Sequence, residues 1–303
     1  MKDFAGKTAF ITGGASGLGL GIAKACAVRG MNVVIADLRQ SALDAAKQVF
    51  DENNWKALFL ILNISDRDGF AKAADAAEAE FGKIHLLVNN AGIACTGGPF
   101  WEVTYEETDF AIDVNLKGIL NGIHEIVPRM LKHGEESHIV STASMAGIIP
   151  NQNFGLYNIT KAGVVSIMET LAEDFGETNI GSSVFCPGPH NTTLGKSSSE
   201  VTGTLMRGED PVTDEEDKPS SFDTSLTKAP DEAGERVLRG ISRGDLYIFT
   251  HSEFKKGFEE KADTILKSFP DEVPDERVCE AFSFLVAHPI FGKQTQVPAY
   301  KKD

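Results

Sequence analysis

Tyr157 and Lys161 stand four residues apart in a stretch with helical composition, so their side chains share one face of the predicted helix. A phenol normally titrates near pH ~10, and a neighbouring ammonium favours the phenolate, which predicts a lowered pKa for Tyr157. Such a phenol can take a proton from an alcohol, or return one to a carbonyl, while a hydride moves to or from a nicotinamide. In isolation the same pair would be a structural aromatic and a solvated cation, so its interpretation depends on the residues around it.

Ser144 is the first residue that favours catalysis. It follows the apolar run 138–141, which predicts a strand, and open α/β sheets place their sites at the carboxyl ends of strands. Its hydroxyl can hold the oxygen that reacts. The sequence therefore predicts that Ser144 works beside Tyr157 and Lys161.

A glycine-rich turn is the second feature. Residues 12–19 read Thr-Gly-Gly-Ala-Ser-Gly-Leu-Gly and lie between a predicted strand and a predicted helix. Glycines let the backbone approach a pyrophosphate with no Cβ in the way, and the free N–H groups and macrodipole at the helix start attract the anion. Glycines also mark ordinary tight turns, so the strand before the turn and the helix after it carry the dinucleotide interpretation.

Asp37 ends the second predicted strand and bears on the choice of coenzyme. A carboxylate there accepts hydrogen bonds from the adenosine ribose hydroxyls and repels a 2′-phosphate, which predicts NAD in preference to NADP. Ser16 is not basic, which also disfavours a phosphate clamp. Arg39 is the nearby basic group that would weaken this prediction, so NADP stays open as a cofactor.

The elements that position these residues alternate between strand and helix. The apolar runs are almost continuous, which is typical of strands covered on both faces of a parallel sheet. The predicted strands are one ending at residue 12, then 31–36, 57–64, 84–88, 138–141, 183–186 and 246–250. The predicted helices are 18–29, 41–50, 66–81, 106–132, 153–178, 231–241, 253–268 and 276–287. This order predicts an α/β protein with a Rossmann-type doubly wound parallel sheet of about seven strands in three α/β/α layers.

Composition excludes several other classes. The formal net charge of −15 argues against nucleic acid and against an anionic membrane surface, both of which require a basic face. No run approaches the roughly 18 apolar residues of a membrane span, and the first residues lack a signal layout. The four cysteines are far apart, with no Cys or His at ligand spacing, so we expect free thiols, no metal and a cytoplasmic location.

The motifs together resemble the short-chain dehydrogenase/reductase superfamily over about residues 5–250. The motifs that carry the resemblance are the Gly-x-x-x-Gly-x-Gly spacing from Gly13, Asn89-Asn90-Ala91-Gly92, Asn115, Ser144 and Tyr157-x-x-x-Lys161. The resemblance implies an NAD(P)-dependent oxidoreductase. It implies that Tyr157 is the general acid/base, Lys161 also binds the nicotinamide ribose, Ser144 orients the substrate and Asn115 holds a water in a proton relay.

The resemblance also implies a set of cofactor contacts. They are Gly13, Ser16, Gly17, Leu18, Gly19, Asp37, Asn63, Ile64, Asn90, Ala91, Gly92, Tyr157, Lys161, Pro187, Gly188 and Thr192. The segment 90–92 would lie by the adenine-side ribose, and Pro187, Gly188 and Thr192 by the nicotinamide half. Asn63 is a departure, because relatives usually carry Asp at this position. An amide can still accept from and donate to the adenine amine, so we expect the site to survive.

Two segments exceed the shorter relatives of about 250 residues. Residues 190–229, rich in Ser and Thr, are expected to be a long loop with short helices, in the position of the family's substrate lid. A C-terminal helical extension covers 251–303, so that residues 1–250 form the core of a single domain spanning 1–303. The apolar side chains expected to make a roomy pocket, about half of which could be plain core, are Ile148, Ile149, Phe154, Leu194, Leu205, Met206 and Phe222.

The tail predicts the substrate class. Residues 244–251 and the helix after them resemble bacterial short-chain dehydrogenases that oxidise the benzylic alcohol of lignin-derived aryl ethers. This predicts interconversion of a bulky hydrophobic secondary alcohol and its ketone, with an aryl alcohol as one candidate. The alternatives are a steroid-type, retinol-type or other bulky alcohol, a non-redox epimerase or dehydratase, and a non-catalytic cofactor-binding protein. The resemblance further implies a homodimer or homotetramer through the helices of residues 106–132 and 153–178.

Overall fold

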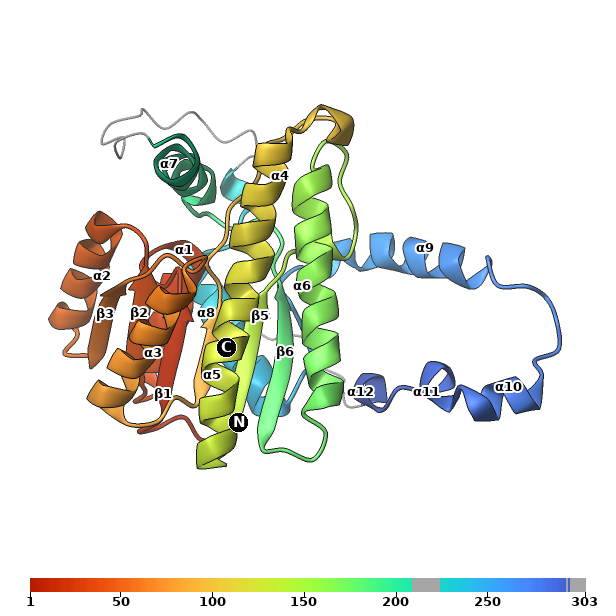
Figure 1. Cartoon of the computed structure of the whole chain (residues 1–303), viewed down its shortest axis with the longest axis horizontal. Coiled ribbons are helices and arrows are strands. Elements are labelled where there is room, and N and C mark those ends of the chain that lie inside the picture. The colour runs from red at the N-terminus through yellow and green to blue at the C-terminus, as the bar shows by residue number, and fades with distance from the viewer. Residues whose placement is uncertain (209–223, 293, 295–303) are drawn as a thin grey trace.

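A seven-stranded parallel sheet forms the centre of the molecule, in the order β3-β2-β1-β4-β5-β6-β7 (Figure 1). The computed structural model describes residues 1–208, 224–292 and 294. The strands are β1 (Thr8–Thr12), β2 (Asn32–Asp37), β3 (Ala57–Ile61), β4 (Leu86–Asn89), β5 (Ser137–Thr142), β6 (Ile180–Cys186) and β7 (Tyr247–Phe249). The chain order reverses at β1 and β4, where doubly wound sheets bind their ligands, so the predicted fold class is confirmed.

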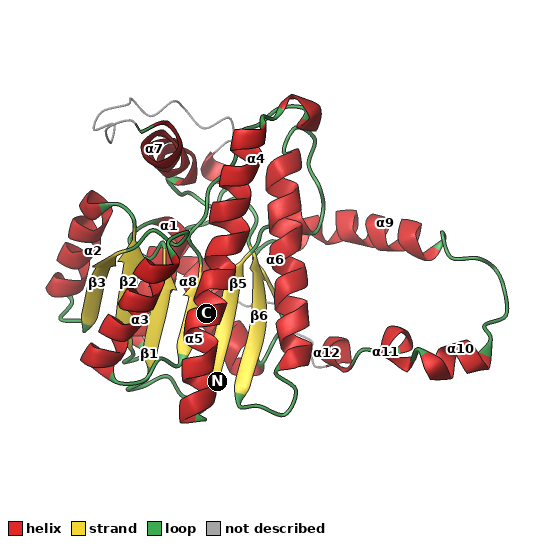
Figure 2. Cartoon of the chain, in the orientation of Figure 1, coloured by secondary structure: helices red, strands yellow, loops and turns green. Residues whose placement is uncertain are grey.

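Helices cover both faces of the sheet (Figure 2). One face packs against α1 (Gly17–Val28), α2 (Gln40–Glu52) and α8 (Pro230–Arg243). The other packs against α3 (Arg67–Phe81), α5 (Gly118–His133) and α6 (Gly155–Asp174). These two helix layers and the sheet between them are the three layers that the sequence predicts.

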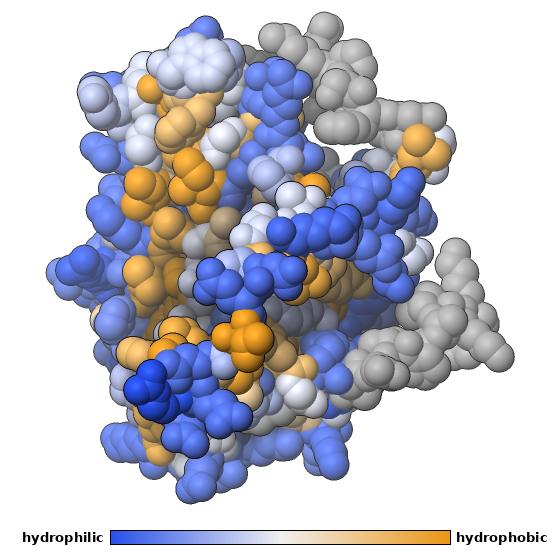
Figure 3. All heavy atoms as spheres, turned by 90° about the vertical axis from the view of Figure 1, so that its right-hand side faces the viewer, coloured by the Kyte–Doolittle hydropathy of each residue, from blue (hydrophilic) through white to orange (hydrophobic). Residues whose placement is uncertain are grey.

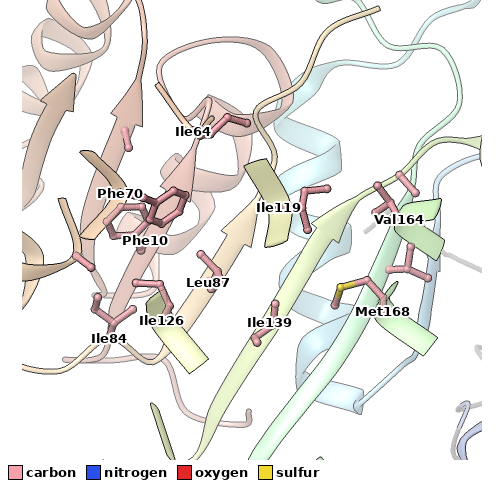
Figure 4. Close-up of a cluster of buried hydrophobic side chains, with 14 of the residues drawn as sticks. Phe10, Ile64, Phe70, Ile84, Leu87, Ile119, Ile126, Ile139, Val164 and Met168 are labelled. Atoms are coloured by element: carbon pink, nitrogen blue, oxygen red, sulfur yellow. The ribbon is translucent and has the colours of Figure 1, made fainter. Parts of the chain in front are cut away.

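Alternate residues of the inner strands enter the two cores, which explains the continuous apolar runs. Phe10 of β1 points into one core and stacks on Phe70 of α3 at 5.7 Å between ring centroids, whereas its neighbour Ile11 lies in the other core. Figure 4 shows the first core, in which Leu87 and Ile139 from β4 and β5 lie between the helices. The edge strand β3 departs from this pattern: its residues are only partly buried and Ile61 is 63% exposed, because β3 is the terminal strand of the described sheet.

The predicted helix over 106–132 consists of three consecutive helical segments. It begins as α4 (Tyr105–Ile112), where Thr104 and Glu107 form a reciprocal capping box. A π-helical turn, Asp113–Lys117, then leads directly into α5. Such turns inside helices occur frequently at functional sites, and this one contains Asn115.

The expectation of short helices within 190–229 is wrong in one respect, because α7 (Leu194–Arg207) has fourteen residues. The Ser and Thr residues that suggested a loop are accommodated by hydrogen bonds back into the helix, such as Ser197 Oγ to the carbonyl of Thr193 at 2.9 Å. Val201 packs against the core, which gives the helix tertiary support that its low intrinsic propensity lacks. Phe222 lies outside the described residues.

The C-terminal extension projects from the body beside α6 (Figure 1). Its helices are α9 (Lys255–Leu266), α10 (Glu276–Ala281), α11 (Ser283–Val286) and α12 (Pro289–Gly292), so the single helix predicted over 276–287 is two short ones. Lys261 Nζ donates to the carbonyl of Ile148 at 2.6 Å, and Ile290 of α12 is buried, which fixes the extension at two points. None of the residues of α9, α10 and α11 is buried.

Helices α1 and α8 cross at two glycines, and this contact yields a stability prediction. A Cβ at Gly234 would overlap the carbonyl oxygen of Gly21 and lie 2.6 Å from its carbon. We expect Gly234→Ala to push the helices apart and lower the free energy of unfolding by about 1–3 kcal/mol, measured by urea denaturation. The control is Gly195→Ala on α7, where nothing lies within 4 Å of the added Cβ. Equal stability of the Gly234→Ala variant and the wild type would show that the crossing tolerates a methyl group.

Candidate active site

The residues expected to do chemistry meet at the carboxyl edge of the sheet. Tyr157 and Lys161 lie on the first turns of α6, and Lys161 Nζ is 5.6 Å from the centroid of the Tyr157 ring. The same ammonium donates to the carbonyl of Thr142, at the end of β5, at 2.9 Å. Lys161 is therefore a buried cation tied to the strand end rather than a solvated one.

Ser144 lies two residues beyond β5 and faces Tyr157. Its Oγ accepts from the N–H of Ala146 at 3.1 Å, which begins a short 3-10 turn, and its side chain hydrogen-bonds with the Tyr157 hydroxyl. That turn packs tightly on α6, because a Cβ at Gly147 would lie 2.5 Å from the carbonyl oxygen of Lys161. Gly147 thus lets the serine-bearing turn approach the helix that carries the tyrosine.

The electrostatics of this pair differ from the prediction. Burial raises the pKa of Tyr157 to about 12, and the hydrogen bond with Ser144 only partly opposes that increase. Burial also lowers the pKa of Lys161 to about 8. The expected lowering of the tyrosine pKa is therefore wrong for this state of the protein, because burial disfavours the charged forms of both groups.

Asn115 connects the segment after β4 with helix α6 through hydrogen bonds. It is fully buried in the π-helical turn; its Oδ1 accepts from the N–H of Ile93 at 2.8 Å, and its Nδ2 donates to the Ile93 carbonyl at 3.0 Å and to Thr160 Oγ1 at 3.2 Å. A Cβ at Gly92 would lie 2.9 Å from Asn115 Oδ1 and 3.5 Å from Lys161 Nζ. Asn115 therefore holds the segment after β4 against the helix of the lysine, and its part in a proton relay stays a prediction.

The glycine-rich turn fits a pyrophosphate. Gly13 has φ +60°, and a Cβ there would lie 2.8 Å from Ala91 Cα, so the turn packs directly on the segment after β4. Asn90 Nδ2 donates to the carbonyls of Thr12 and Gly13 at 3.2 and 3.1 Å, which locks the ends of β1 and β4 together. Because α1 begins at Gly17, its first N–H groups and its dipole are directed at this turn.

The end of β2, where the sequence predicts the adenosine ribose, is strongly charged. Asp37 is buried at the end of β2 and accepts from the N–H groups of Ala15 at 3.4 Å and Arg39 at 3.2 Å. The guanidinium of Arg39 lies 3.5 Å from Asp37 Oδ1 and donates to Ser16 Oγ at 2.8 Å and to Glu200 Oε2 at 3.4 Å. The basic residue that weakened the NAD prediction is thus engaged by two carboxylates.

The remaining predicted contacts lie at the same edge of the sheet, but the side chains of two of them, Ile64 and Leu18, pack against the cores. Asn63 follows β3, and its Oδ1 accepts from the N–H of Ser65 at 3.1 Å, whereas the side chain of Ile64 packs into the core against Gly118. Gly188 donates to Thr250 Oγ1 at 3.0 Å, and Thr192 lies 3.4 Å from a Cβ at Gly17. Leu18 packs against the second core.

The predicted pocket side chains divide into core and surface. Ile148 is buried and Ile149 partly buried in the core, whereas Phe154, Leu194 and Leu205 are exposed. Two contacts of the site have no motif in the sequence: Ser198 Oγ accepts from the N–H of Ala94 at 2.9 Å, and Glu200 binds Arg39. Within the described residues, no group of three or more His, Cys, Asp or Glu could hold a metal ion, and no helix could cross a membrane.

Comparison with known proteins identifies the family that this geometry indicates. The family model described as short chain dehydrogenase matches residues 7–202, which contain the turn, Asn115, Ser144, Tyr157 and Lys161. The chain belongs to the short-chain dehydrogenase family. It is therefore an oxidoreductase that uses NAD or NADP to interconvert a secondary alcohol and its ketone.

Relatives match most of this short-chain dehydrogenase. A C alpha-dehydrogenase from a Sphingobium strain is 32% identical over 270 residues, covering 88% of each chain. The structure of a short-chain dehydrogenase from Novosphingobium aromaticivorans is 32% identical, covers 94% of this chain and 98% of that one, and superposes with a TM-score of 0.79. A short-chain dehydrogenase/reductase from Burkholderia phymatum, solved in complex with NAD, is 29% identical with a TM-score of 0.77, covering 91% of this chain and 100% of that one.

Proposed function

We propose that this enzyme uses NAD to oxidise a bulky hydrophobic secondary alcohol, of aryl type, to its ketone. The observation that carries the chemistry is the convergence of Tyr157, Ser144 and Lys161 at the carboxyl edge of the sheet beside the glycine-rich turn. The substrate class is supported by the likeness to the Sphingobium C alpha-dehydrogenase over 88% of this chain. Exposed Phe154, Leu194 and Leu205 near the site are consistent with an apolar substrate.

The proposed roles follow from the geometry. Ser144 donates a hydrogen bond to the substrate oxygen and holds it beside Tyr157, whose phenolate form accepts the alcohol proton. Lys161 places its ammonium over the tyrosine ring, where a positive charge opposes the cost of forming a buried phenolate. Asn115 keeps the segment 92–95 against α6. A bound nicotinamide supplies the hydride acceptor.

The raised pKa of Tyr157 gives the two directions of the reaction different pH dependences. The phenolate exists above this pKa of about 12 and disappears as the pH falls, so kcat/KM for alcohol oxidation should rise by up to about tenfold per pH unit from about pH 7 to about pH 8. Above about pH 8 the rise should become shallower, because Lys161 loses the positive charge that favours the phenolate. Ketone reduction needs the protonated phenol, which is fully present over that range. The kcat/KM for ketone reduction should therefore not rise with pH. Rate profiles in both directions test this, and an oxidation rate that falls with rising pH would contradict the role of Tyr157.

NAD is the proposed coenzyme because Asp37 is buried at the end of β2 and Arg39 is engaged by two carboxylates. A carboxylate at this position accepts from free ribose hydroxyls and repels a 2′-phosphate. Titration of the enzyme with NAD and NADP in parallel measures this preference. Tighter binding of NADP would reverse it.

A substrate panel tests the proposed reaction. NADH formation would be measured with aryl-ether secondary alcohols, steroids, retinol and simple alcohols. Turnover on the aryl alcohols supports the proposal, whereas turnover only on steroids or retinol would replace the substrate class. Conversion without net NADH would indicate an epimerase or dehydratase, and coenzyme binding without conversion of any compound would indicate a non-catalytic protein.

The assembly is proposed to be at least a homodimer of single-domain chains in the cytoplasm. The support lies in large apolar side chains that the described chain leaves at its surface on the extension, and Figure 3, which views the molecule from that side, shows hydrophobic side chains on this face. They are Phe258, Ile265, Leu266, Phe269, Phe282, Phe284, Leu285 and Val286. Apolar surface on this scale marks an interaction site in soluble proteins. Light scattering would detect the dimer, and a monomeric mass would contradict it.

A further inference from the structure

The helix α7 contacts both the segment after β4 and the segment after β2, between which the cofactor is expected to bind. Near the reacting groups, its Ser198 Oγ accepts from the N–H of Ala94 at 2.9 Å. At the adenosine end, its Glu200 Oε2 lies 3.4 Å from the Arg39 guanidinium. Figure 1 shows α7 at the edge of the sheet where β1 and β2 end. The lid helix therefore brings a carboxylate to a position next to the expected adenosine ribose.

The charges around this ribose are unbalanced. The cation of Arg39 lies between Asp37, 3.5 Å from its Nε, and Glu200, while its Nη2 donates to Ser16 Oγ at 2.8 Å. The side chains of Arg39 and Glu200 are only 21% and 23% exposed, so solvent screens their interaction incompletely. Two carboxylates and one guanidinium leave a net charge of −1 beside the end of β2.

We propose that Glu200 determines coenzyme choice from the lid, by engaging Arg39 and so excluding a 2′-phosphate. The 2′-phosphate of NADP is attached to the ribose that Asp37 is expected to bind, so it would meet Arg39 and Ser16. A free arginine beside Asp37 could form a two-pronged hydrogen bond with that phosphate. Glu200 occupies one prong of the guanidinium and adds a negative charge that the phosphate would face. This inference rests on the proposed preference for NAD. It assigns part of that preference to Glu200 on α7, in addition to Asp37 at the end of β2.

The test measures binding rather than turnover. Calorimetric titrations give the dissociation constants of NAD and NADP, and those of adenosine 5′-monophosphate and adenosine 2′,5′-bisphosphate, which carry only the adenosine end. The variants are Glu200→Gln, Arg39→Ala and both together. The matched control is Glu177→Gln, an exposed acid between α6 and β6 at the opposite edge of the sheet, which changes the net charge equally.

Glu200→Gln should improve the binding of NADP relative to NAD by about 3–10-fold, with the same change for the two adenosine probes. Most of this gain should vanish when Arg39 is alanine. A ratio within about twofold of the wild type, equal weakening of both coenzymes, an equal effect of Glu177→Gln, or an undiminished gain without Arg39 would each overturn the inference. The ratio of the NADP and NAD dissociation constants of the wild type separately tests the proposed NAD preference. A failure of that preference is therefore distinguishable from a failure of the role proposed for Glu200.

Discussion

Replacing Tyr157 with phenylalanine is expected to lower kcat for alcohol oxidation by about 10²–10⁴-fold, the usual contribution of a positioned acid/base group. The change removes only the hydroxyl that hydrogen-bonds with Ser144. The ring stays beneath the Lys161 ammonium, which remains held by the Thr142 carbonyl. The fold and the dissociation constant for NAD should therefore stay close to those of the wild type.

Tyr247→Phe is the matched control for this loss of a phenolic hydroxyl. Its hydroxyl donates to Glu169 Oε1 at 2.5 Å, twelve residues further along α6 than Tyr157, or about 18 Å along the helix axis. Removing it should lower stability and leave kcat nearly unchanged. Near-normal turnover by Tyr157→Phe, or an equal loss in both variants, would remove Tyr157 from the chemistry.

The second large effect concerns the glycine-rich turn. A Cβ at Gly19 would overlap the carbonyl oxygen of Gly13 and lie 2.6 Å from Asn90 Nδ2. The same Asn90 Nδ2 donates to that carbonyl at 3.1 Å, so an alanine at Gly19 displaces both partners of a hydrogen bond that shapes the turn. We expect Gly19→Ala to weaken NAD binding by at least about 100-fold, or about 2.7 kcal/mol, because the turn can no longer approach the pyrophosphate.

Gly240→Ala serves as the control for this variant. It adds the same methyl group at a crowded position on α8, 2.5 Å from Ile248 Cδ1 of β7, which lies four strands from β1 in the sheet. It should lower the free energy of unfolding and leave the dissociation constant for NAD within about threefold of the wild type. If Gly19→Ala binds NAD normally, or if Gly240→Ala loses binding equally, the turn is not the pyrophosphate site.

Local patterns predicted the sheet and the main site residues because both depend on short-range features. The continuous apolar runs of β1, β4 and β5 identified strands buried on both faces, and the spacing of Tyr157 and Lys161 identified one helix face. The strand predicted over 57–64 is present as β3, but the prediction that it is buried on both faces is wrong, since a run of apolar residues does not reveal that a strand lies at the edge of the sheet.

Other features depend on contacts that no local pattern contains. The length of α7 comes from tertiary packing through Val201, which outweighs the weak helix propensity of its serines. The raised pKa of Tyr157 reflects burial by the whole fold, whereas its spacing from Lys161 shows only the neighbouring charge. The pair of Arg39 and Glu200 joins residues separated by 161 positions, so neither residue predicts the other.

The central claim is that this chain couples oxidation of a bulky aryl secondary alcohol to reduction of NAD through Tyr157. The most direct measurement quantifies ketone and NADH in the same reaction, for the wild type and for Tyr157→Phe. The account predicts one NADH for each ketone with the wild type, and almost none of either with the variant. Conversion of the alcohol without NADH, or equal yields from both proteins, would contradict it.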